Sequence, residues 1–141
     1  MSDTVVVLAD ERPAPTDGPL ARARLRLRLV LGAGHKLGPG KIDLLEAIAA
    51  TGSISGAGRT MGMSYRRAWI LIDEANHMFV EPLVATSAGG AGGGGAHLTH
   101  LGRGGVAAFR RIEARTRAAI AEELGPVEAR FADLDAPLPE R

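Results

Sequence analysis

Apolar and polar positions change their spacing several times along the chain, and each change predicts a structural element. Between Arg24 and Leu31, leucines alternate with arginines. This period of two predicts a strand with one buried face and a charged outer face. Pro39 then suits the start of a helix, and Gly52 suits its end. The apolar positions of that helix are Ile42, Leu45, Ile48 and Ala49.

Two more helices are predicted around a glycine-containing turn. Ser53 can cap a short helix that runs from Ile54 to about Met61. Gly62 interrupts the pattern, and Ser64 can cap a third helix with the sequence YRRAWILIDEANHMF. The apolar stripe of this third helix consists of Ala68, Leu71, Ile72 and Ala75.

The remaining pattern predicts a hairpin followed by a long helix. Two short strand candidates, at residues 82–86 and 96–99, flank a stretch in which six of the seven residues from Gly89 to Gly95 are glycine. This order indicates a hairpin with a long tip. A helix then runs to about Leu124, where Gly125 and Pro126 end it. Its apolar face contains Leu101, Val106, Phe109, Ile112, Thr116, Ala119, Ile120 and Leu124.

These elements predict a mainly α fold with a small antiparallel β-sheet. The net charge of +1 conceals a basic segment at residues 21–124, with fourteen Lys or Arg against eight acids. We expect residues 1–20 to form a disordered acidic arm and residues 125–141 a flexible acidic tail. The basic middle, including the long last helix, favours a polyanionic partner, although it is also compatible with ordinary surface charge.

The second and third helices form a helix-turn-helix candidate. Gly58 and Gly62 are small where the two helices would approach each other. The residues that begin the third helix suit DNA, because arginine can bond guanine while hydroxyl groups and the helix N-terminus can bond phosphate. They are Ser64, Tyr65, Arg66 and Arg67. The alternative is an ordinary helical hairpin with surface arginines.

The stretch GSISGAGRTMGMSYRRAWILIDEAN, followed by EPLVATSAGGAGGGGAHLTHLG, resembles the N-terminal DNA-binding domain of ModE-type molybdate-responsive transcription regulators. The resemblance covers about residues 25–124. It implies a winged helix-turn-helix, related to that of LysR-type regulators, which binds palindromic operators as a homodimer. It also implies that the third helix is the recognition helix and that the glycine run is the tip of the wing.

The resemblance and the pattern together give the expected site residues. We expect contact with double-stranded DNA from Ser53, Ser64, Tyr65, Arg66, Arg67, Thr86, Gly89, Gly90, Gly92, Gly93, Gly94 and Gly95. We expect the dimer interface to include Phe109, Ile112, Thr116 and Ile120.

The sequence also argues against several kinds of functional site. We expect a cytoplasmic regulator with no catalytic residue, cofactor, metal site or membrane partner, because the chain contains no cysteine and no apolar run of about 20 residues. The regulators of this type continue into molybdate-binding domains of the molbindin type. Because the sequence ends at Arg141, we do not expect molybdate binding in this chain.

Other functions fit the residues less well. The glycine run lacks the Gly-Lys-Ser/Thr of a phosphate-binding enzyme loop. His97 and His100 would need a third ligand to hold a metal. The serious alternative is a winged-helix module that binds a protein partner rather than specific DNA, and steep salt dependence of duplex binding would distinguish the two. Trp69 is expected in the core or at a dimer interface.

Overall fold

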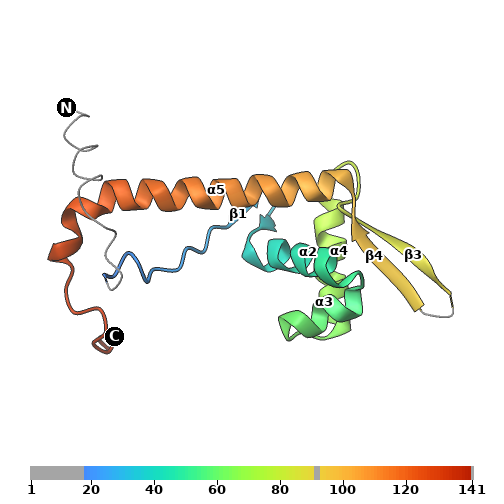
Figure 1. The fold of residues 1–141 in the computed structure, drawn as a ribbon, viewed down its shortest axis with the longest axis horizontal. Helices are drawn as coiled ribbons and strands as arrows, with labels where there is room; N and C mark the ends of the chain where they lie inside the picture. The colour runs from blue at the N-terminus through green and yellow to red at the C-terminus, as the bar shows by residue number, and fades with distance from the viewer. Residues whose placement is uncertain (1–17, 91–92, 141) are drawn as a thin grey trace. The chain divides into compact units, whose positions relative to one another are not determined.

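The computed structural model describes residues 18–90 and 93–140 (Figure 1). These residues divide into two compact units. One combines the described residues up to Leu25 with those from Thr116 onward, and the other lies between Arg26 and Arg115. The second unit spans the positions of all residues predicted to contact DNA. Among the described residues, no helix is long and apolar enough to cross a membrane.

The described chain is mainly α with small antiparallel sheets, as predicted. Its helices are α2 (Pro39–Thr51), α3 (Ile54–Met61), α4 (Tyr65–His77) and α5 (His100–Leu124), and a 3₁₀-helix η1 (Gly125–Arg130) follows α5. Strand β1 (Leu29–Leu31) pairs with β2 (His35–Leu37), and β3 (Val84–Gly90) pairs with β4 (Gly93–Leu98). The long last helix therefore ends where Gly125 and Pro126 predict.

The ends of α2 and α3 follow from the residues that flank them. Pro39 occupies the first turn of α2, and Gly52 ends this helix in the left-handed conformation, with φ of 75°. The Ser53 hydroxyl accepts a hydrogen bond of 2.8 Å from the backbone N–H of Gly56 and so caps α3. The predicted stop and cap are thus both confirmed.

The core of the Arg26–Arg115 unit is built mainly from α2 and α4. All four predicted stripe residues of α4 are buried, namely Ala68, Leu71, Ile72 and Ala75. The predicted helix α2 is present, but its buried side differs from the apolar positions used to predict it, because Ala49 is exposed whereas Leu44 and Ala47 are buried. Because α2 contacts α3, α4, β2 and β4, it is buried on more than one side, which a single stripe does not anticipate.

The strand predicted between Arg24 and Leu31 is shorter and less buried than expected. Only Leu29–Leu31 is a strand, and its partner β2 was not predicted because its sequence, HKL, has no apolar alternation. Leu29 and Leu31 are exposed, whereas Leu27 packs against the core. A two-stranded ladder of this length supplies no second apolar layer, so alternation alone did not bury the leucine face.

The second hairpin extends further into the glycine run than predicted. Strand β3 continues to Gly90 and β4 begins at Gly93, and these two glycines pair across the hairpin after a register shift that follows Ser87. Much of the run is therefore paired strand rather than a long loop. Of the predicted wing residues, Gly92 lies outside the described residues.

The hairpin is fastened at its base to both neighbouring helices. The Asn76 side chain on α4 accepts hydrogen bonds of 2.8 and 3.0 Å from the N–H groups of Leu83 and Val84. At the other strand, Thr99 accepts from the N–H of Gly102 at 3.0 Å and donates to the Pro82 carbonyl at 2.8 Å. A side chain at Gly102 would collide with the Leu83 carbonyl, so glycine lets α5 start close to β3.

One arginine joins α5 to α2, and the sequence pattern gave no indication of it. Arg110 donates hydrogen bonds to Glu46 at 2.6 and 3.0 Å, to Asp43 at 2.6 Å and to Glu113 at 2.8 Å. Glu113 is only 4% exposed although it is charged. The hydrogen bonds from Arg110 lower the pKa of Glu46 from its ordinary value, outweighing partial burial, which acts to raise it.

Candidate nucleic-acid interface

The turn between α3 and α4 fixes how the two helices meet. Gly62 adopts the left-handed conformation, with φ of 68°, and the next N–H, that of Met63, donates to the Gly58 carbonyl at 2.9 Å. A Cβ at Gly58 would lie only 3.2 Å from the Met63 carbonyl oxygen. Gly58 therefore allows the predicted close approach, whereas Gly62 is needed for the backbone of the turn itself.

The N-terminus of α4 is capped and exposed. The Ser64 hydroxyl accepts a hydrogen bond of 3.0 Å from the N–H of Arg67, and the first turn contains no acidic residue. Tyr65, Arg66 and Arg67 are all exposed. The positive end of the helix dipole and two guanidinium groups thus lie together, and the cap holds them on an ordered backbone.

Neither guanidinium is neutralised within the described part of the chain, where Arg66 and Arg67 form no ion pair and no side-chain hydrogen bond. Burying an unpaired charge raises the free energy of the folded state, but both arginine side chains stay exposed to solvent and avoid this cost. Their charge is available to an external anion.

The exposed residues of α4 fall on distinct sides of the helix because successive residues rotate by about 100°. Arg66 and Ile70 lie opposite the buried stripe. Tyr65 and Trp69 lie on the flank that also carries Asn76, which bonds β3. Trp69 is 44% exposed, so it does not belong to the core, and the alternative expectation of a dimer interface stays a prediction. Arg67 lies on the opposite flank of α4 from Trp69.

The second hairpin brings further predicted residues close to the start of α3. The Ala96 N–H donates to the Gly52 carbonyl at 2.9 Å, which places Gly95 beside the turn that precedes Ser53. The Ser87 hydroxyl accepts from the Gly95 N–H at 3.2 Å. Thr86 is exposed on β3. Residues distant in sequence, the cap of α3 and the base of the hairpin, are therefore neighbours.

The residues predicted at a dimer interface differ in exposure along α5. Phe109 is only 2% exposed and belongs to the core of its own chain, so it offers no surface to a second chain. Ile112 is 43% exposed, and Thr116 and Ile120 are partly exposed. Helical spacing indicated an apolar face but did not separate its buried beginning from its exposed continuation.

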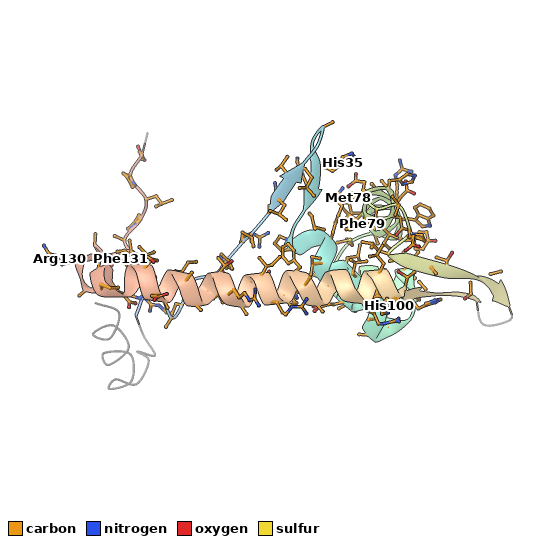
Figure 2. The ribbon with its side chains drawn as sticks, turned by 90° about the horizontal axis from the view of Figure 1, so that it is seen from above. His35, Met78, Phe79, His100, Arg130 and Phe131 are labelled. Carbon is orange, nitrogen blue, oxygen red and sulfur yellow. The ribbon has the colours of Figure 1, made fainter. Side chains whose placement is uncertain are left out.

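The histidines considered as metal ligands are exposed at separate places. His97 lies on β4. His100 begins α5 and is labelled in Figure 2. Within residues 18–90 and 93–140, no group of three or more His, Cys, Asp or Glu side chains could hold a metal ion.

Comparison with known proteins finds relatives whose names refer to molybdenum. It is 38% identical over 102 residues to the molybdenum-pterin-binding protein MopA of Rhodobacter capsulatus, covering 72% of this chain and 37% of that protein. It is 42% identical over 95 residues to the molybdenum transport protein ModE of Azotobacter vinelandii, covering 67% of this chain and 35% of that protein.

A third relative is described by its name as a regulator. The DNA-binding transcriptional dual regulator ModE of Escherichia coli K12 is 42% identical over 82 residues, or 58% of this chain and 31% of that protein. No protein-family model matches the chain. The chain spans about a third of the length of the curated relatives that it matches. Over about 70% of its length, at about 40% identity, it is homologous to the molybdenum proteins ModE, MopA and MopB.

Proposed function

We propose that this chain is a ModE-type transcription regulator and that its Arg26–Arg115 unit is a winged helix-turn-helix domain that binds double-stranded DNA sequence-specifically. The observation that carries the proposal is the N-terminus of α4, where Arg66 and Arg67 stand exposed and unpaired within the described chain on a capped helix. Relatives described as transcriptional regulators support it.

In this proposal α4 enters the major groove, which is about 12 Å wide and admits one helix. Arg66, opposite the buried stripe, bonds a guanine edge. The hydroxyl groups of Ser64 and Tyr65 and the first N–H groups of α4 bond phosphates and set the register. Thr86 and the paired glycines of β3 and β4 bring the hairpin backbone against the DNA backbone or into the minor groove.

We further propose that the regulator acts as a homodimer. Ile112, Thr116 and Ile120 follow one side of α5, and a two-fold axis there would present two copies of α4 to a palindromic operator. Half-sites should then lie about one helical turn, or a multiple of it, apart. We propose that such an operator lies near genes of molybdenum metabolism, and the names of two relatives, which refer to molybdenum, support this. We assign no molybdate site to the described residues.

Selection of bound duplexes from a random pool tests the proposal. The purified chain should enrich one motif with two inverted half-sites, and footprinting should protect the same motif in genomic DNA. Binding should also weaken steeply with salt, because phosphate contacts release counterions. If no motif were enriched and binding to duplexes were negligible at low salt, the protein-interaction module would be the better account.

A further inference from the structure

A basic groove lies beside α4 on the flank that carries Arg67. It has a volume of about 670 Å³, and its lining comes from the residues before β1, from the β1–β2 hairpin, from the first turn of α2 and from α4. Figure 2 shows His35 near the tip of the hairpin and Met78 at the end of α4, both of which line the groove. All of these residues belong to the Arg26–Arg115 unit.

The charge of the groove is strongly unbalanced. Its lining includes five Lys or Arg side chains and a single carboxylate, that of Glu74. Lys41 is engaged, because its ammonium lies 3.2 Å from Glu74 and donates to the Lys36 carbonyl at 2.9 Å. The other four cations form no ion pair or side-chain hydrogen bond with a described residue, and they are Arg26, Arg28, Lys36 and Arg67.

The end of α2 that faces the groove adds to this positive potential. Gly38 precedes the helix without a side-chain cap, and Pro39 leaves no N–H to satisfy. The first turn of α2 contains no acid that would offset the helix dipole. A cluster of like charges that also meets a helix N-terminus is stabilised when an anion enters it.

The position of the groove argues for one particular anion. Arg67 and Met78 are eleven residues apart on the same flank of α4, so the groove follows this helix for about 16 Å. A helix about 10–12 Å across fills a major groove about 12 Å wide, and its flanks then face the sugar–phosphate strands at the groove edges. An open channel of cations along one flank fits an extended row of phosphates better than a single small ion.

We propose that this groove binds the phosphate backbone of the DNA strand beside α4, with Arg28, Lys36 and Arg67 as its principal contacts. This inference rests on the proposed function, and it assigns different roles to two adjacent arginines. Arg66, opposite the buried stripe, reads a base edge, whereas Arg67, on the flank of the groove, bonds phosphate and carries no sequence information.

Salt dependence of binding to a random-sequence duplex tests the groove without requiring an operator. We compare the full chain with R28Q/K36Q, with R67Q, and with the matched control R111Q/R115Q, which removes two exposed cations of α5. Each lost phosphate contact should reduce the slope of log affinity against log salt by about 0.9. R28Q/K36Q should therefore lose about 1–2 units of slope and R67Q about 1, while the control loses less than about 0.5.

Each outcome decides the proposal, provided that thermal melting shows all variants folded. Equal slopes for R28Q/K36Q and its control would overturn it. A second result would also overturn it: calorimetry shows that the parent binds tripolyphosphate, and R28Q/K36Q abolishes this binding without changing the affinity for the duplex. The groove would then bind a free anion rather than DNA. A groove-dependent slope in a chain that selects no DNA motif would support the groove and contradict the proposed sequence-specific function.

Discussion

Replacing Arg110 by Met should destabilise the Arg26–Arg115 unit more than the removal of any other single charged side chain. Met keeps an unbranched apolar stem in place of the arginine stem but removes every hydrogen bond that joins α5 to Asp43 and Glu46 on α2. It also leaves Glu113, whose side chain is 5% exposed, without its cation 2.8 Å away. The substitution thus leaves the buried Glu113 carboxylate without its cation, and it leaves the half-exposed carboxylates of Asp43 and Glu46, which repel each other, without theirs.

The size of the effect follows from the burial of each pair. Breaking a buried ion pair from one side costs about 3–5 kcal/mol, whereas an exposed pair contributes about 0–1 kcal/mol. The Arg110 side chain is 33% exposed, and those of Asp43 and Glu46 are 45% and 47% exposed, so solvent screens much of the network. We therefore expect a loss of about 2–3 kcal/mol, or about 10–20 °C in Tm.

Urea unfolding followed by the fluorescence of Trp69, the sole tryptophan, reports on the unit that contains Arg110. Arg111→Met is the matched control, because its side chain is exposed and forms no ion pair with the described chain. It should change stability by less than about 0.5 kcal/mol. Equal unfolding midpoints for the two variants would refute the reasoning, whereas partial rescue of R110M by E113Q would support it.

Other variants test separate parts of the account. Arg110 lowers the pKa of Glu46, so the stability that their ion pair contributes is present above about pH 4.5 and is lost below it. The difference in Tm between the parent and R110M should therefore narrow from pH 7 to pH 3. Gly102→Ala should lower Tm because its Cβ would clash with the Leu83 carbonyl, whereas Gly104→Ala, with open space around its Cβ, should stabilise by about 0.5–1 kcal/mol in the same melting assay. Changing Gly93 and Gly94 to Val should weaken duplex binding with little change in Tm; unchanged affinity would contradict the proposed role of the wing. Sedimentation should give a dimer at micromolar concentration and a monomer for Ile112→Glu; a monomeric parent would contradict the dimer.

The sequence predicted those elements whose signals are local. The four buried positions of α4 follow from helical spacing, and the caps at Ser53 and Ser64 follow from hydroxyl side chains placed just before helices. These features depend on residues three or four apart, so they can be identified without knowledge of the fold. The exposed cationic start of α4 belongs to the same class.

What the sequence missed depends on contacts between distant segments. The groove gathers residues from four separate segments, and none of those segments is unusual by itself. The buried Glu113 was hidden in a charged helix, although Arg110 three residues earlier was an available signal. The exposed Leu29 and Leu31 show the converse error, because alternation indicates a strand but does not establish that a layer covers it.

The proposed assignment of Arg66 gives the most direct test of specific DNA recognition. The measurement is the ratio of affinities for the selected operator and for a scrambled duplex of equal length, for the parent, Arg66→Ala and Arg111→Ala. Loss of a bidentate guanine contact should cost about 1–3 kcal/mol, so Arg66→Ala should lower the ratio roughly 5- to 150-fold. Arg111→Ala should leave the ratio unchanged. An unchanged ratio for Arg66→Ala would contradict the assignment of α4 as the helix that reads the sequence.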